Sequence, residues 1–267
     1  MINLFQLREH EFLRILPILD HHRTPTFAYS IVHRIVPGVV YVDYRKDPKS
    51  AFLGTNSGIY YIVGEETNRK FNESFKAFFM QHVKSKHVRF TLFSSSDHWD
   101  KVIQSLLQGE FTQMTRKPFV FHPSKFRAEN MRIPENFRLQ KIDEEIIQRS
   151  VDFNESYYEE YWGSVSNFLS NSFGFCLLDG DGKIVSECTS IFLANGYAEI
   201  DIVTHPEYRG RGFAALTSKA FIEYCLSKGL IPRWDCDENN VSSMKLAEKL
   251  GFSCPQTYCL FIRKRNK

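Results

Sequence analysis

Apolar and polar residues alternate through the second half of the chain in a way that predicts a sheet. Short-period alternation is found over residues 137–142, and longer apolar runs cover residues 174–178, 184–193 and 197–204. The first two of these runs are joined by residues 179–182, Asp-Gly-Asp-Gly, a sequence typical of a β-hairpin turn. We therefore expect successive, mostly antiparallel strands, preceded by a helix from about residue 143 and a second, aromatic helix.

The first half of the chain has a less regular pattern. Pro17 interrupts or ends its first predicted helix. The expected order is helix, three strands, helix, strand and helix, over residues 9–19, 38–44, 51–54, 58–64, 72–84, 88–93 and 97–107. This order loosely parallels the second half, and the irregular stretch of residues 125–135 is the expected linker.

A loop rich in glycine and arginine follows the strand that ends at Thr204 and precedes a helix predicted from Phe213. The first backbone N–H groups of a helix lack intrahelical partners, and the helix dipole adds partial positive charge there. Glycines allow close approach of the backbone, and arginines add charge, so the pattern predicts a phosphate site. The residues concerned are Arg209, Gly210, Arg211 and Gly212.

Two common phosphate loops do not fit this sequence. No Lys-Ser or Lys-Thr pair follows the last glycine, so it is not a Walker loop. The third glycine and the acidic residue of a dinucleotide fold are also missing. A tight connection between strand and helix, with no ligand, is the structural alternative.

The motif Arg209-x-x-Gly212-x-Ala214 resembles the acyl-coenzyme A loop of the GNAT superfamily of N-acetyltransferases. Residues 240–252 resemble the Asn-x-x-Ser/Ala-x-x-Leu-x-x-x-x-Gly-Phe signature that closes GNAT domains. Together with Trp234-Asp235-Cys236, the pattern looks most like the GNAT subfamily that includes the zwittermicin A resistance acetyltransferase. The resemblance covers residues 137–262, about half of the chain.

The resemblance implies an α/β fold with α+β character. A GNAT domain, with a mixed, mostly antiparallel central sheet flanked by helices, is expected over residues 137–267. Residues 1–130 are expected to form a separate N-terminal α/β domain, for which a degenerate GNAT-like repeat is one interpretation. Because this half has no Arg-x-x-Gly-x-Ala motif, only the C-terminal half is expected to bind coenzyme A.

The resemblance also implies acetyl-CoA as the donor substrate. Strand residues are expected to pair with the pantetheine arm, the loop with the pyrophosphate, and Asn240 with the pantetheine arm, assisted by Ser243. The strand and loop positions are Ile202, Val203, Thr204, Arg209, Gly210, Arg211, Gly212, Phe213 and Ala214.

Acid–base groups are less clearly indicated. Glu199 and Asp201 lie two positions apart on one strand and should share a face, with Glu199 placed first as the base. A β-bulge would change which face of the strand reaches the substrate cleft. A water relay would make neither residue essential to catalysis. The structural alternative is that the carboxylate is exposed or ion-paired on the strand and has no catalytic role. Many relatives have a tyrosine where this chain has Ala247. Either Tyr258 supplies the proton, or the thiolate leaves unaided because a thiol has a pKa near about 8.5.

The acceptor is expected at the aromatic and acidic segment of residues 154–162, which would suit a cationic amine through charge and cation–π contacts. The alternative is that these side chains form core and solvated helix surface. The candidate substrate-binding residues are Glu155, Tyr158, Glu159, Tyr161 and Trp162.

Composition limits the partners. The chain has 267 residues, 43% of them hydrophobic, and a net charge of +3 that is spread along the sequence, which does not favour nucleic-acid binding. No apolar run reaches ~18 residues and the start does not resemble a secretory signal, so neither membrane insertion nor export is expected, and a cytoplasmic location is. The six cysteines have no Cys-x-x-Cys pairs and are expected to be free thiols, without a metal site.

The function expected from all this is acetyl transfer from acetyl-CoA to a primary amine of a small molecule, with an aminopolyol antibiotic as one acceptor class and antibiotic resistance as the role. A non-catalytic acyl-CoA-binding or regulatory module is the alternative, motivated by Ala247. Aminoacyl transfer from charged tRNA by a tandem GNAT-like protein is a third. A homodimer is a candidate assembly.

Overall fold

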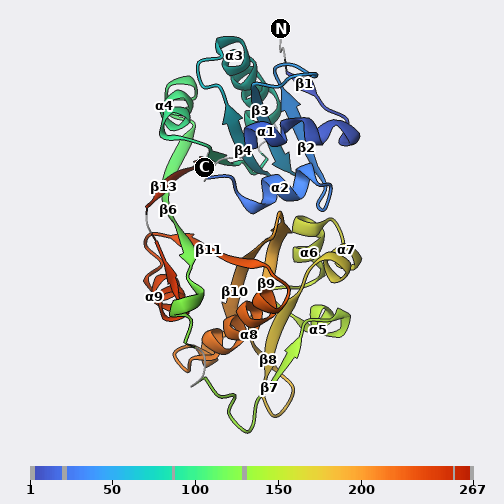
Figure 1. The fold of residues 1–267 in the computed structure, drawn as a ribbon, viewed down its shortest axis with the longest axis vertical. Coiled ribbons are helices and arrows are strands. Elements are labelled where there is room, and N and C mark those ends of the chain that lie inside the picture. Colours follow the sequence, from blue (N-terminus) through green and yellow to red (C-terminus); the bar gives the residue numbers. More distant parts are fainter. Residues whose placement is uncertain (1–3, 20–22, 86–87, 128–130, 255, 265–267) are drawn as a thin grey trace. The chain divides into compact units, whose positions relative to one another are not determined.

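The computed structural model of the protein describes residues 4–19, 23–85, 88–127, 131–254 and 256–264. The chain, traced in Figure 1, forms two compact units. One contains residues 1–115 together with 258–267, and the other contains residues 116–257. The C-terminal strand therefore belongs with the first 115 residues of the chain.

These units do not follow the ranges 1–130 and 137–267 expected from the sequence. β6 (Phe111–Phe121) pairs through residues 116–119 with β11 (Ile231–Asp237), so the residues after 115 belong to the second unit. β13 (Tyr258–Arg263) pairs with β5 (Thr91–Ser94) of the first unit. Both assignments depend on pairing between strands far apart in sequence, which no local pattern shows.

The second unit contains a mixed, mostly antiparallel sheet, as the sequence predicts. Its strands run in the order β7, β8, β9, β10, β11, β6, and β12 pairs with β6. Only β10 and β11 are parallel neighbours, because a helix connects them. The elements not yet defined are β7 (Arg138–Lys141), α5 (Glu144–Arg149), α6 (Glu155–Trp162), α7 (Val165–Asn171), β8 (Gly174–Leu178), β9 (Ile184–Ala194), β10 (Tyr197–Thr204), α8 (Phe213–Ser227), α9 (Val241–Lys249) and β12 (Phe252–Ser253).

The two faces of this sheet are covered by different helices. α8 packs across β8 to β11 (Figure 1), and its Phe221 shares a buried cluster with Ala198 and Ile200 of β10. Side chains alternate along a strand, so Asp201 points to the opposite face. There Tyr157 of α6 donates a hydrogen bond to Asp201 Oδ2 at 2.8 Å. β10 therefore presents an apolar side to α8 and a polar side to α6.

β10 and β11 stay paired over a short distance only. Their register joins Tyr197, Ala198 and Glu199 to residues 231–233. β11 then continues along β6, whereas β10 continues along β9 to Thr204. Beyond Glu199, the edge of β10 that faces β11 is open.

The first unit repeats the order of strands and helices seen in the second. Strands β2, β3 and β4 are antiparallel, and α3 connects β4 to β5, which is parallel to β4. The sheet order is β1, β2, β3, β4, β5, β13. The elements are β1 (Phe5–Gln6), 3₁₀ helix η1 (Glu9–Ile15), α1 (Leu16–Leu19), α2 (Thr26–Val32), β2 (Gly38–Val42), β3 (Ser50–Thr55), β4 (Ile59–Gly64), α3 (Arg69–Phe78), η2 (Phe79–Lys84) and α4 (Asp97–Leu106).

Pro17 lies in the first turn of α1, where the missing N–H has no intrahelical partner to lose. The predicted helix over residues 9–19 is therefore a 3₁₀ segment followed by a short α-helix. The core of this unit is mostly aromatic and includes Phe52, Phe75, Trp99 and Phe261. The sequence pattern did not predict α2.

Replacing Phe261 by alanine tests whether β13 belongs to the first core. Phe261 is 1% exposed and pairs with Leu92, so loss of the ring should lower the free energy of unfolding of this unit by about 3–5 kcal/mol. Val241→Ala, at a side chain that is 51% exposed, is the control and should change it by less than about 0.5 kcal/mol. Urea unfolding measures both. Equal stability of the Phe261 variant and the parent protein would contradict the assignment.

Candidate active site

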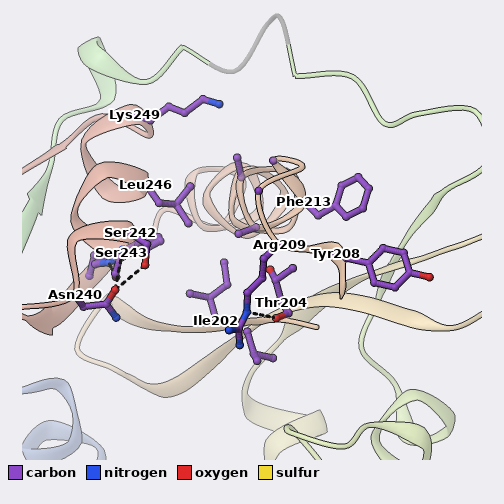
Figure 2. Close-up of a pocket in the computed structure, with 16 residues that line it drawn as sticks. Ile202, Thr204, Tyr208, Arg209, Phe213, Asn240, Ser242, Ser243, Leu246 and Lys249 are labelled. Atoms are coloured by element: carbon purple, nitrogen blue, oxygen red, sulfur yellow. Dashed lines mark hydrogen bonds between the residues drawn. The ribbon is translucent and has the colours of Figure 1, made fainter. Parts of the chain in front are cut away.

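A cavity of about 560 Å³ lies in the second unit where β10 parts from β11. Figure 2 shows its walls, formed by the end of β10, the loop before α8, the start of α8, and α9. Ten of the eleven predicted donor-binding residues line it: Ile202, Val203, Thr204, Arg209, Gly210, Gly212, Phe213, Ala214, Asn240 and Ser243. The structure thus brings together two motifs that are about thirty residues apart in sequence.

The open edge of β10 carries backbone groups that point into this cavity. Val203 faces β9, because its carbonyl accepts a hydrogen bond from Ser186 Oγ at 3.1 Å. Ile202 and Thr204 therefore face the other way. The Ile202 N–H donates to Asp201 Oδ1 at 2.9 Å. The Thr204 carbonyl accepts from Arg209 Nε at 3.1 Å, and Figure 2 shows this second hydrogen bond. Side chains of the protein thus occupy the hydrogen-bonding positions where the pantetheine arm was expected.

The loop before α8 is shaped for close approach of an anion. Gly210 and Gly212 have φ angles of 78° and 84°, which favour glycine, and a Cβ at either would meet no atom within 4 Å. Gly212 is the N-cap of the fifteen-residue helix α8. The N–H of Ala215 donates to the Gly212 carbonyl, so the N–H groups of Phe213 and Ala214 precede the intrahelical ladder. These groups and the helix dipole favour a phosphate at this position.

Arg211 is the one residue predicted to bind the donor acetyl-CoA that is not among the residues lining this cavity. Its guanidinium lies 5.2 Å from the centroid of the Tyr208 ring, while Tyr208 itself lines the cavity. Lys249 of α9 also lines it, and the sequence analysis missed this residue. The described lining contains cations from two walls and no carboxylate, as suits an anionic ligand. Lys249 follows Ser242 by seven residues and Leu246 by three, and both of these also line the cavity, so helical spacing within α9 could have indicated it.

Asn240 and Ser243 also have structural roles. The Asn240 side chain caps α9 by accepting hydrogen bonds from the Ser243 N–H at 3.0 Å and from Ser242 Oγ at 2.9 Å. The hydroxyl of Ser243 accepts from the indole Nε1 of buried Trp234 at 2.9 Å. The Asn signature therefore fixes the start of α9, and with it one wall of the cavity.

The two candidate bases lie in different surroundings. Asp201 is partly buried, and this burial raises the pKa of its carboxyl group, although Tyr157 and the Ile202 N–H oppose the rise. Glu199 stands at the last position where β10 pairs with β11, opposite Arg233. The pairing register between β10 and β9 shifts between Glu199 and Ile200, in the segment where the sequence analysis considered a β-bulge. The extra residue lies on β9, so Glu199 and Asp201 still share one face of β10.

α6, the helix expected to bind the acceptor, contacts Asp201 of β10 through Tyr157, which was not among the predicted acceptor residues. Tyr158 and Trp162 are 0% exposed; the Tyr158 hydroxyl lies 3.1 Å from Thr189 Oγ1, and the Trp162 indole donates to the Ser190 carbonyl. These positions correspond to the core alternative considered for this segment. Tyr157, which the sequence analysis did not select, binds Asp201. The N-cap Asn154 fixes where α6 begins and therefore which side chains face the sheet, and this was the sequence signal that could have indicated Tyr157.

The remaining candidates of this segment are more accessible. Glu155 and Glu159 are exposed, and Tyr161 is partly buried with its ring centroid 6.0 Å from that of Phe192. Asp201 and these side chains lie on or beside the face of the sheet that α6 covers. An acidic and aromatic surface of this kind suits a cationic ligand.

Tyr258, the candidate for the catalytic acid, is not among the residues that line the cavity, and neither is Ala247, which stands where many relatives have tyrosine. Ala247 is 0% exposed and packs in the core between the sheet and α9. Tyr258 belongs to the first unit, where its ring centroid lies 5.9 Å from that of Phe93. The hydroxyl groups in the described lining belong to Thr204, Tyr208, Ser242 and Ser243.

The described residues show neither a metal centre nor a membrane-spanning helix. They contain no group of three or more His, Cys, Asp or Glu side chains arranged to hold a metal ion. None of their helices is long and apolar enough to span a membrane. The six cysteines are unpaired, and four of them are buried.

The mixed sheet and the glycine-rich loop before α8 fit a protein of the acyltransferase class, and comparison with known proteins gives the family. The family description "GNAT acetyltransferase" matches residues 16–261. The chain belongs to the GNAT acetyltransferase family and is an acyltransferase, whose family uses acetyl-CoA as donor. The match includes most of the first unit, which the motifs alone did not cover.

Individual relatives agree with this assignment. The chain is 45% identical over 256 residues to an uncharacterized N-acetyltransferase, YdfB, of Bacillus subtilis strain 168, covering 96% of this chain and 97% of that one. A GCN5-related N-acetyltransferase-like protein from Streptococcus suis 89/1591 has a TM-score of 0.72 at 22% identity, over 96% of this chain and 99% of that one. A tandem GNAT protein from the clavulanic acid biosynthesis pathway has a TM-score of 0.68 at 11% identity, covering 97% of both chains. The two structures show a shared fold.

The loop assignment is tested by replacing Gly212 with leucine. The new side chain would point into open space in the cavity, and acetyl-CoA affinity should fall at least about tenfold because close backbone approach is lost. Gly196→Leu is the matched control, since Gly196 has a φ of 77° and equally open surroundings in the turn between β9 and β10. Calorimetric titration measures both. Equal losses in the two variants would attribute the effect to backbone strain and reject the loop assignment.

Proposed function

We propose that this protein transfers the acetyl group of acetyl-CoA to a primary amine of a small molecule by direct attack of the amine on the thioester. The observation that carries the proposal is the cavity between the open edge of β10 and the glycine-rich start of α8. It offers an anion site at one end and strand-edge hydrogen-bonding groups at the other. An extended pantetheine arm linked to a pyrophosphate has the complementary chemistry.

In this proposal the donor replaces two internal contacts. The pantetheine arm pairs with Ile202 and Thr204 as an added strand would, displacing the Asp201 carboxylate and the Arg209 guanidinium from those backbone groups. The pyrophosphate binds the N–H groups of the loop and the first turn of α8, with Arg209 and Lys249 supplying positive charge. A strand-edge N–H is then available to the thioester oxygen, where negative charge develops.

Asp201 is the base in this scheme. The acceptor arrives as an ammonium ion and must lose a proton before its nitrogen can attack. Asp201 is favoured over Glu199 because burial raises its carboxyl pKa, which makes it a better proton acceptor, and because Tyr157 holds its orientation. Tyr157 is a positioning residue. The exposed carboxylates of α6, Glu155 and Glu159, attract the cation.

The thiolate needs no dedicated acid in this account. Nitrogen attack forms the new C–N bond, and collapse of the tetrahedral intermediate breaks the C–S bond. Water can protonate the released thiolate, since a thiol has a pKa of about 8.5. This agrees with Ala247 at the position where many relatives have tyrosine.

An aminopolyol-type antibiotic is the finer acceptor class that we propose, with resistance as the role. The support is the resemblance of Trp234-Asp235-Cys236 and the closing signature to the zwittermicin A resistance subfamily. The acidic residues of α6 suit such a polycation. A cytoplasmic site of action and a homodimeric assembly complete the proposal.

Asp201→Asn tests the identity of the base. Loss of a general base should lower kcat by about a hundredfold or more while acetyl-CoA still binds. Glu199→Gln is the matched control and should lower kcat much less. The reverse order of effects would transfer the role to Glu199, and equal small effects would support a water relay.

Tyr157→Phe tests the positioning role through the pH profile. The Tyr157 hydroxyl favours the ionised form of Asp201, so its removal should raise the pKa of that carboxyl. The acidic limb of kcat/KM should then move to higher pH by about one unit, since such hydrogen bonds contribute about 1.5–3 kcal/mol. Tyr158→Phe is the control because its hydroxyl binds Thr189. An unmoved limb in Tyr157→Phe, or equal shifts in both variants, would reject this role.

An acceptor panel tests the reaction itself. Acetyl-CoA and a series of monoamines, polyamines and aminopolyols should release free coenzyme A only when an acceptor is present, fastest with polycationic acceptors. Thiol titration with Ellman's reagent measures the release. Donor binding without acceptor-dependent release across the panel would contradict acetyl transfer to amines.

A further inference from the structure

A second and smaller cavity, of about 120 Å³, lies in the second unit between the end of α5, the segment after it, β9 and the end of β10. Only Val203 is shared with the described lining of the donor cavity. Glu187 of β9 lines it and is 3% exposed. The proposed acetyl transfer uses none of the other residues of this cavity.

The Glu187 carboxyl group has an incomplete set of partners. Its Oε2 accepts a hydrogen bond from Ser150 Oγ at 2.8 Å. Its Oε1 is buried and has no hydrogen-bond partner among the described residues. Burial raises the pKa of this carboxyl to about 7, with a smaller contribution from Asp152. Buried polar atoms are almost always paired, so an empty oxygen beside a cavity indicates a missing partner.

The neighbouring cations are engaged elsewhere. Arg149 donates to Glu145 Oε1 at 3.1 Å and to the Gly182 carbonyl, and Lys183 donates to Glu207 Oε2 at 3.0 Å. His205 Nδ1 is also buried and without a hydrogen bond in the described part of the chain, at 3.7 Å from Glu207 Oε2. Glu187 and His205 of the lining thus each have one buried, acceptor-capable atom without a hydrogen-bond partner among the described residues, and none of the described basic side chains of the lining is paired with Glu187.

We propose that this cavity binds the ammonium group of a small primary amine, with Glu187 Oε1 as its main acceptor and His205 Nδ1 as a second. A buried carboxylate is stabilised by a cation, and an ammonium group brings three donors. The volume equals about four waters at about 30 Å³ each, enough for an ammonium with two or three carbons.

Two further observations favour an organic cation. Val151, which lines the cavity, is 83% exposed and offers an apolar contact to the carbon chain. No group of three or more His, Cys, Asp or Glu side chains in the described ranges is arranged for a metal ion. The site does not depend on the proposed acetyl transfer, and its occupant need not be the acceptor.

Calorimetric titration with propylamine in the absence of acetyl-CoA tests the site. Glu187→Gln keeps the shape of the side chain and should weaken binding at least about tenfold, because a charge-assisted hydrogen bond is lost. Glu223→Gln makes the same chemical change on the exposed side of α8 and should leave binding unchanged. Asp201→Asn distinguishes this site from the acceptor site, because it changes the proposed base and no residue that lines the smaller cavity. Loss of binding in Asp201→Asn with retention in Glu187→Gln would place the amine at the acceptor site and overturn the proposal.

The pH dependence provides a second readout. Glu187 must lose its proton to hold the ammonium, so affinity should rise about tenfold from pH 6 to pH 8 in the parent protein and stay level in Glu187→Gln. The other titratable or charged groups around Glu187 are Asp152, Arg149, Lys183, His205, Tyr158 of α6 and Cys176 of β8. A rise that persists in Glu187→Gln would assign the proton to one of these groups and contradict the role of Glu187.

Val151→Lys tests the same cavity at an exposed position, so its result does not depend on whether the Glu187 variant folds. Its parent side chain is almost fully exposed, so the fold should be unaffected, and the new ammonium group at the mouth of the cavity should compete with free propylamine. Propylamine binding should therefore fall. Unchanged binding in this variant, or no binding to the parent protein at millimolar propylamine and pH 8, would overturn the proposal.

Discussion

The parting of β10 from β11 after three residue pairs is the constraint on which the rest of the second unit depends. It leaves backbone N–H and C=O groups on the edge of β10, and such groups need partners. Asp201 and Arg209 supply them, each from a residue adjacent or near in sequence. Both contacts are local. In the proposed function an extended ligand replaces them along the strand edge without opening any packed core.

Two carboxyl groups share the polar face of this sheet in contrasting surroundings. Asp201 accepts hydrogen bonds from Tyr157 and the Ile202 N–H, and both counter the effect of burial on its pKa. Among the described residues, Glu187 accepts a hydrogen bond from Ser150 alone, and burial raises the pKa of its carboxyl group to about 7. The two carboxylates thus differ in the number of hydrogen-bond donors that they receive from the described residues. Asp201 is accordingly the oriented group, and Glu187 the one with capacity for a further partner.

The sequence predicted which residues line the larger cavity because its signals are local. The Arg-x-x-Gly-x-Ala loop and the Asn240 cap act through backbone groups within a few residues, so the resemblance of these two motifs to a known family indicated ten residues that line one cavity. Other features depend on contacts between distant segments. Tyr157 and Asp201 are 44 residues apart, and a one-residue difference in helix phase separates Tyr157 from the buried Tyr158. The C-terminal strand β13 likewise belongs to the first unit because it pairs with β5, and the periodicity of the sequence does not show such a pairing.

In the proposed function, acetyl-CoA binds along the open edge of β10 and at the start of α8. Backbone amide NMR during titration with acetyl-CoA tests it most directly, since each N–H reports on its own partner. We expect the largest shifts at Ile202, Thr204 and the amides of residues 210–214, and the Ile202 amide should shift because its hydrogen bond to Asp201 is replaced. Shifts confined to other segments, with these amides unchanged at saturating acetyl-CoA, would contradict it.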